Sequence, residues 1–246
     1  MTDIHIYNNP AELYTKAAGV FLQTGTEALD RQGIFSVALS GGSTPLPLYR
    51  KLAREPAADS LDWNKAHFFW GDERAVGPDH PDSNFGEVYH SLLEPRAVPL
   101  KNIYRIEGEL QPETAAQKYQ KDLLDWFGDT PPRFDLIILG LGSDGHTASL
   151  FPVKIPGESS RDAENTWVKA VYVPGMGSWR ITFTARLINA ASKILFLVTG
   201  RNKARTLNQV INGPYIPDTY PAQLIQPDNG QLIWLVDQDA AAELDL

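Results

Sequence analysis

The sequence predicts an α/β fold in which a mostly parallel sheet is covered by helices on both faces. Three observations support this prediction. Short apolar runs rich in β-branched and aromatic residues alternate along the chain with segments of helical periodicity. The runs are apolar nearly throughout, which is typical of strands buried on both faces of a parallel sheet. The 246 residues contain no internal repeat and no low-complexity linker, so we expect a single domain over residues 1–246.

The first predicted element is a helix over residues 12–31, where Leu13, Val20 and Phe21 recur at helical spacing. Strands are predicted at 34–40, 67–71, 134–140, 168–173, 193–200 and 231–237. Further helices are predicted at 45–54, 83–93, 112–127, 184–192, 202–211 and 238–245. Pro45 is expected at the first helical position of the helix 45–54. The stretches rich in Pro, Gly and Asp are expected to be loops bordering a site at the strand ends, namely 74–82, 152–166 and 212–230.

The composition is that of an ordinary globular protein, with 43% hydrophobic and 21% charged residues. No leader-like apolar segment opens the chain and no apolar run approaches the roughly 20 residues of a membrane span, so we expect no membrane partner. The absence of cysteine excludes disulfides and thiolate nucleophiles, and it fits the cytoplasmic location that we expect without requiring it. A net charge of −8 without a basic run argues against a nucleic-acid partner.

The stretch LGLGSDGHTASLFP (139–152) directly follows a predicted strand, and its three glycines match the G-x-G-x-x-G of dinucleotide sites. Such a site also needs a helix after the glycines and an acid near the end of the next strand. Pro152 leaves no room for that helix, and the next strand ends without an acid. A Walker A loop would need a lysine where His146 stands. The sequence therefore favours neither nucleotide site.

What remains is an Asp-Gly-His turn at a strand end, which places the His146 imidazole beside the Asp144 carboxylate. Such a pair is suited to proton transfer, so His146 and Asp144 are the candidate catalytic residues. The alternative is that His146 only caps a helix or is satisfied within the turn. A Ser-centred nucleophile elbow is excluded, because Ser143 follows Leu141-Gly142 and G-x-S-x-G requires a glycine two residues before the serine.

The stretch LSGGSTPLPLY (39–49) also runs from a strand end to a helix start. Its glycines let the backbone approach a ligand, the amides of the first helical turn are unpaired, and two hydroxyls add donors. We therefore predict a phosphate site at Gly42, Ser43 and Thr44. The alternative is a plain helix cap with a glycine turn.

The stretch HFFWGDERAVGPDHPDSNFG (67–86) ends a buried strand in three consecutive charges, of which Asp72 and Arg74 are candidate substrate-binding residues. Such charges are either a solvated strand end or part of a site. Asn84 is a further candidate for substrate binding, with a role as helix N-cap as its alternative.

Two isolated cations lie near predicted strand ends, Arg180 in GSWRITFT and Lys203 in VTGRNKA. Lone cations usually belong to the solvated surface, as Arg186, Arg201 and Arg205 are expected to. An acidic protein that binds a phosphate nevertheless needs a local positive cluster, and Arg180 and Lys203 are the best placed to supply it. The five histidines show no paired metal-binding spacing, so no metal and no cofactor is expected.

Taken together, SGGSTP, WGDER with SN downstream, DGHTASLFP, WRITFT and VTGRNKA closely resemble the 6-phosphogluconolactonase family, in order and over nearly the whole chain. The resemblance implies a Rossmann-like α/β fold and metal-free, cofactor-free hydrolysis of 6-phospho-D-glucono-1,5-lactone, a step of the oxidative pentose phosphate pathway. It implies that His146 is a general base, that Asp144 orients it or touches the sugar, and that Asp72 and Arg74 line the sugar. The substrate would be a small sugar phosphate, and the chain could be a monomer or a dimer.

Two other functions stay open at this stage. The related glucosamine-6-phosphate deaminases share the phosphate loop and the Asp-Gly-His turn, but they continue from that turn through FNEP with a functional glutamate and carry a tyrosine where Arg74 stands. The present chain reads SLFP there, which favours the lactonase. A sugar-phosphate sensor without catalysis would be expected to lose His146, which is present.

Overall fold

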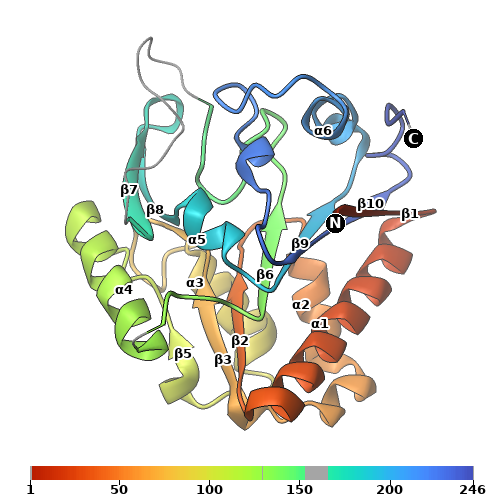
Figure 1. Cartoon of the computed structure of the whole chain (residues 1–246). Coiled ribbons are helices and arrows are strands. Elements are labelled where there is room, and N and C mark those ends of the chain that lie inside the picture. The colour runs from red at the N-terminus through yellow and green to blue at the C-terminus, as the bar shows by residue number, and fades with distance from the viewer. Residues whose placement is uncertain (1, 129, 153–165, 246) are drawn as a thin grey trace.

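The structure is a computed structural model, and it describes residues 2–128, 130–152 and 166–245. Its centre is a sheet of seven strands, all of them parallel. The strand order is β1 (Thr2–Tyr7), β10 (Gln231–Asp237), β9 (Lys193–Val198), β6 (Leu136–Gly140), β2 (Phe35–Leu39), β3 (Ala66–Trp70) and β5 (Ile103–Tyr104). The predicted mostly parallel α/β fold is confirmed (Figure 1).

Six α-helices are found in the described residues: α1 (Pro10–Gln32), α2 (Leu46–Arg54), α3 (Asn84–Val88), α4 (Pro112–Phe127), α5 (Ala185–Asn189) and α6 (Ala204–Ile211). Neighbouring residues of β3 show that helices cover opposite faces, because successive side chains of a strand point in opposite directions. Phe68 stacks on Trp63, which stacks in turn on Phe21 of α1. Phe69 instead packs edge-on against Trp126 of α4. Among the described helices, none is long and apolar enough to cross a membrane.

A second, antiparallel sheet lies beside the first and consists of β4 (Asp72–Arg74), β8 (Ser178–Phe183) and β7 (Val168–Val173) (Figure 1). The run 168–173 is thus a strand as predicted, but it is wrong to count it with the strands buried on both faces. Tyr172 is 48% exposed, and residues 169–171 are only partly buried. A run of β-branched and aromatic residues suits both kinds of sheet, so the pattern alone does not separate them.

The helix predicted at 238–245 is also wrong, because residues 238–243 form turns and no helix follows them in the described chain. The Asp237 side chain accepts from the Ala240 amide (2.8 Å), which turns the chain at the point where a helix would begin. Pro45 is the N-cap of α2 rather than its first residue. The predicted helix 83–93 divides into α3 and one π-helical turn at Tyr89–Leu93.

Candidate functional site

The motifs found in the sequence meet at one edge of the central sheet. The loops that carry them follow β9, β6, β2 and β3, which are adjacent in the strand order, and parallel strands end at a common edge. Between these loops lies a cavity of about 220 Å³. The cavity also lies at a switch point of the strand order. From β2 the chain continues to β3 on one side of β2, whereas the later strand β6 lies on its other side. Ligands of open α/β sheets bind at such points.

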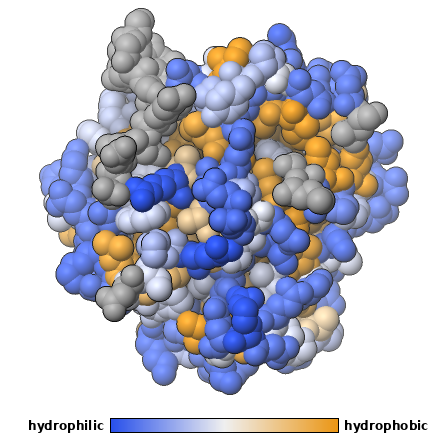
Figure 2. Space-filling view, viewed as in Figure 1, coloured by the Kyte–Doolittle hydropathy of each residue, from blue (hydrophilic) through white to orange (hydrophobic). Residues whose placement is uncertain are grey.

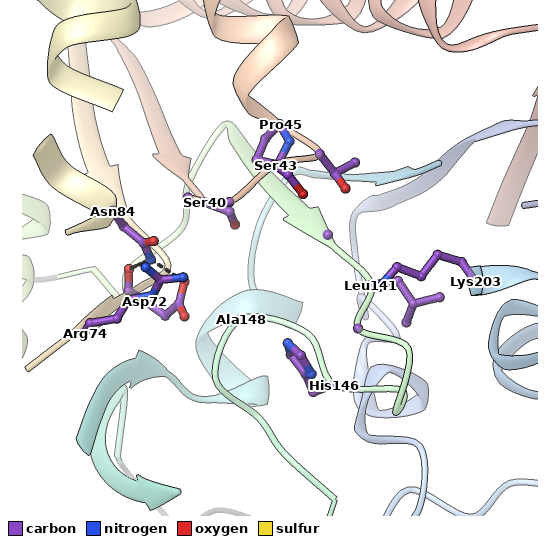
Figure 3. A pocket seen from close by; sticks show the side chains of 15 residues that line it. Ser40, Ser43, Pro45, Asp72, Arg74, Asn84, Leu141, His146, Ala148 and Lys203 are labelled. Atoms are coloured by element: carbon purple, nitrogen blue, oxygen red, sulfur yellow. Dashed lines mark hydrogen bonds between the residues drawn. The ribbon is translucent and has the colours of Figure 1, made fainter. Parts of the chain in front are cut away.

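Most of the predicted site residues line this cavity, and Figure 3 labels six of them. They are Gly42, Ser43, Thr44, Asp72, Arg74, Asn84, His146 and Lys203. In that view the group of Asp72, Arg74 and Asn84 lies on one side and Lys203 on the other, with Ser43 and His146 on facing sides between them. The site is therefore polar around its rim and carries a cation at each end.

Asp144 does not line the cavity but holds the imidazole that does. Its Oδ1 lies 2.5 Å from His146 Nδ1 and also accepts from the His146 backbone amide at 3.2 Å. Partial burial works against ionisation of Asp144, but the hydrogen bond and charge of His146 outweigh it and lower its pKa to about 2. An ionised carboxylate can only accept a hydrogen bond, so in the neutral form of the imidazole Nδ1 donates to Asp144 and Nε2 is left to accept a proton.

The turn that presents this pair is fixed from several sides. A Cβ on Gly142 would collide with the His146 ring and with Asp144 Oδ1, so only glycine leaves room for the pair. Gly145 has a φ of 85° and packs on Tyr220. Ala148 adopts a φ of 46°, a left-handed conformation that costs a non-glycine residue free energy. Backbone strain of this kind is concentrated at functional sites.

The Asp72 side chain is buried and held from two directions. Ser149 Oγ donates to Asp72 Oδ2 at 2.6 Å, and Asn84 Nδ2 donates to the Asp72 carbonyl at 2.9 Å and to its Oδ1 at 3.3 Å. Asn84 therefore is not the N-cap of α3; Ser83 is, accepting from the Gly86 amide (3.1 Å). The contact of Ser149 with Asp72 was not predicted. Ser149 belongs to the DGHTASLFP stretch, but nothing in that stretch indicates a contact with residue 72.

Glu73, the middle residue of Asp72-Glu73-Arg74, has a structural role. Glu73 is 2% exposed, and its carboxylate accepts from the backbone amides of Arg74 (2.8 Å), Asn84 (2.7 Å) and Phe85 (2.8 Å). Two of these amides belong to the first turn of α3, which has no helical partner for them. Glu73 thus fixes the start of α3 against the end of β4.

The predicted phosphate loop offers free donors, with one correction. In the described part of the chain, no protein group accepts a hydrogen bond from the amide or hydroxyl of Ser43 or Thr44. The Gly42 amide is not free, because it donates to Glu87 Oε2 at 2.8 Å. Gly42, with a φ of 95°, therefore lines the cavity without offering its N–H to a ligand.

The two predicted phosphate cations are placed differently. Lys203 lines the cavity, its ammonium has no carboxylate partner in the described chain, and burial lowers its pKa. Arg180 is not among the residues that line the cavity, so its contact with a phosphate stays a prediction. In the antiparallel pairing of β4 with β8, Arg180 lies opposite Arg74, which is at the end of the cavity away from Lys203 (Figure 3). The Arg180 guanidinium donates to Ser178 Oγ (2.8 Å) and to the Trp179 carbonyl (3.0 Å).

Two further predictions concern loops and metals. Of the loop 152–166, residues 153–165 lie outside the described residues, so its predicted place at the site stays a prediction. Arg74 Nη1 donates to the Asp82 carbonyl, which draws the loop 74–82 around the edge of the site. Within the described ranges, no group of three or more His, Asp or Glu side chains is placed to hold a metal ion.

Comparisons with known proteins agree with the motifs. The family model described as glucosamine-6-phosphate isomerases/6-phosphogluconolactonase matches residues 8–234. A 6-phosphogluconolactonase of Nostoc sp. is 40% identical over 247 residues, covering 98% of this chain and 98% of its own. A 6-phosphogluconolactonase of Aggregatibacter actinomycetemcomitans is 43% identical over 205 residues, covering 83% of this chain and 85% of its own.

Solved structures show the same similarity. The 6-phosphogluconolactonase of Trypanosoma cruzi superposes with a TM-score of 0.86 at 28% identity, covering 100% of this chain and 98% of its own. A monomeric glucosamine-6-phosphate deaminase superposes with a TM-score of 0.80 at 22% identity, covering 98% and 99%, which shows a shared fold and no more. The family resemblance expected from the motifs is confirmed.

Proposed function

The chain belongs to the glucosamine-6-phosphate isomerase/6-phosphogluconolactonase family, and we propose that it hydrolyses 6-phospho-D-glucono-1,5-lactone to 6-phospho-D-gluconate. One observation carries the proposal: the Asp144-oriented imidazole of His146 faces the same cavity as Ser43, Thr44 and Lys203, whose donors have no acceptor within the described residues. A proton acceptor for water and a site for a phosphate are thus within one small space. The relatives named 6-phosphogluconolactonase support the same activity.

In the proposed mechanism, His146 Nε2 takes a proton from a water molecule while the water oxygen bonds to the lactone carbonyl carbon. The carbonyl π electrons move to its oxygen, and the resulting oxyanion is stabilised by the Arg74 guanidinium. The oxyanion then collapses, the bond to the ring oxygen breaks, and the imidazolium returns its proton to that oxygen. Asp144 keeps the ring oriented and stabilises its charged form throughout.

The phosphate would bind at the other end of the cavity. Ser43 and Thr44 offer two hydroxyls and two amides at the start of α2, and Lys203 adds a full positive charge. Asp72 and Asn84 remain for the sugar hydroxyls, with Asp72 fixed by the Ser149 and Asn84 hydrogen bonds. This arrangement places the dianion away from the Asp72 carboxylate, which would repel it.

The deaminase is the second candidate, and the structure of the turn disfavours it. The segment Ser149-Leu150-Phe151 follows the turn without a glutamate, and the Phe151 ring packs against the His146 ring at 4.5 Å between centroids. Residues 147–152, the described segment that follows His146, therefore supply no carboxylate. The residue at position 74 is an arginine, which suits a developing oxyanion.

One pair of assays tests the proposal. The purified protein should accelerate lactone hydrolysis above the spontaneous rate, with or without EDTA, and should release no ammonia from glucosamine-6-phosphate. Ammonia release at comparable efficiency would make the chain a deaminase, and binding of 6-phosphogluconate without turnover would make it a sensor. The single-domain organisation, cytoplasmic location and oligomeric state stay predictions.

A further inference from the structure

The residues behind the phosphate loop form a support that lies outside the ligand cavity. Glu87 holds the Gly42 amide (2.8 Å), yet Glu87 does not line that cavity. It lines a separate cavity of about 440 Å³, together with Arg50, His80 and His90. The Gly42 N–H therefore points out of the ligand site and toward its rear. Gly42 has a φ of 95°, a left-handed conformation that favours glycine at this point of the loop.

The two preceding loop residues are also held, Ser40 by Tyr49 and Gly41 by Asn84. The Ser40 amide donates to the Tyr49 hydroxyl (3.2 Å), which donates in turn to the Ser40 carbonyl (2.7 Å). Gly41 packs so closely on Asn84 that a Cβ would collide with the Asn84 amide group. The loop is thus fixed at three successive residues, 40 to 42. Removing the Glu87 contact would release Gly42, which is the held residue nearest to Ser43 and Thr44.

The short helix α3 connects this support to the sugar end of the site. Asn84 and Glu87 are three residues apart and so lie on one face of α3. Asn84 holds Asp72 at 2.9 Å, Glu87 holds Gly42, and Glu73 fixes the start of the helix. One rigid turn of helix therefore sets the distance between the groups proposed for the sugar and those proposed for the phosphate.

We infer that Glu87 is a positioning residue that fixes the phosphate loop and thereby sets the preference for phosphorylated over unphosphorylated lactone. The inference rests on the proposed function for its substrate. Glu87 acts through hydrogen-bond acceptance, because its negative charge by itself would repel a bound phosphate. Its effect reaches the ligand through the direction of the Ser43 and Thr44 donors, which follow Gly42 directly in the chain.

The experiment compares Glu87→Ala with Glu87→Gln. Alanine removes the acceptor, so the KM for 6-phosphogluconolactone should rise about 10-fold while kcat changes less than about 2-fold. Glutamine keeps an acceptor oxygen without the charge, so its KM should stay within about 3-fold of the wild-type value. Neither variant should change kcat/KM for unphosphorylated gluconolactone. Glu94→Ala is the matched control, because that 58% exposed carboxylate pairs with His90 and leaves the loop alone.

Three results would overturn the inference: an unchanged KM in Glu87→Ala, a lower KM in both variants, or equal losses on both lactones. The last would indicate general damage to the fold, which thermal unfolding of each variant would register. Binding of inorganic phosphate, measured by calorimetry, keeps the test separate from the proposed function. A wild type without lactonase activity would refute that function, while a phosphate affinity weakened about 10-fold by Glu87→Ala alone would still support the role of Glu87.

Discussion

Replacing Gly142 with alanine should disable the His146–Asp144 pair without unfolding the protein. An ideal Cβ at Gly142 would lie 2.5 Å from Asp144 Oδ1 and overlap the His146 ring. Gly142 has no positive φ, so alanine is not excluded by its backbone conformation. The methyl group must therefore act through the clash with these two side chains.

The size of the effect follows from that clash. Ordinary contacts begin near 3.4 Å, and the Cβ would lie 2.2 Å from His146 Nδ1 and 2.5 Å from Asp144 Oδ1, so these atoms must retreat by about 1.2 Å and about 0.9 Å. A displacement of about 1 Å from the productive geometry costs about 10²-fold in rate, or about 2.7 kcal/mol of activation free energy. Both side chains are partly exposed, at 29% for His146 and 48% for Asp144, so they can move outward without disrupting the core.

The assay is steady-state lactone hydrolysis, corrected for the spontaneous reaction, together with thermal unfolding and calorimetric binding of 6-phosphogluconate. We expect kcat to fall about 10²-fold, with the melting temperature and the product affinity close to wild type. Gly19→Ala is the control, because a Cβ there meets nothing within 4 Å and alanine favours the helix. A Gly142→Ala enzyme that kept more than a third of wild-type kcat would refute the proposed importance of the pair's geometry.

The remaining predictions concern the proton acceptor and the phosphate cation. His146→Ala should lower kcat by about 10²–10⁴-fold and leave the affinity for 6-phosphogluconate nearly intact; a variant retaining more than a tenth of wild-type kcat would reduce His146 to a structural residue of the turn. Lys203→Ala should raise KM for the phosphorylated lactone about 10- to 150-fold and leave the unphosphorylated lactone unaffected; equal losses on both would contradict the phosphate contact. Burial lowers the pKa of Lys203, so its ammonium loses its proton at a lower pH than an exposed lysine does. The affinity for 6-phosphogluconate should therefore weaken toward alkaline pH in the wild type and not in Lys203→Ala. Calorimetry between about pH 7 and pH 10 tests this.

The sequence by itself determined the strands of the central sheet that are apolar throughout, and with them the position of the site. The runs that became β2, β3, β6, β9 and β10 carry this pattern, and the motifs that hold Ser43, Asp72, His146 and Lys203 begin where the first four of these strands end. In a parallel sheet these ends share one edge, so residues as distant as Ser43 and Lys203 were expected to meet. The structure places both on the same cavity. Strand β1 was missed, because its residues, 2–7, mix polar and apolar side chains at the edge of the sheet.

The tertiary structure alone decided which partner each polar group has. Arg180 and Lys203 are equivalent in sequence as lone cations near strand ends, yet antiparallel pairing places Arg180 across from Arg74, and only Lys203 of the two lines the cavity. The sequence predicts that the Gly42 amide is free to bind a ligand, yet in the structure this amide donates to Glu87, 45 residues away. Pairing between strands and the direction of a glycine amide depend on contacts between distant segments. Local periodicity and spacing do not predict those contacts, because they indicate only which face of a helix or strand is apolar.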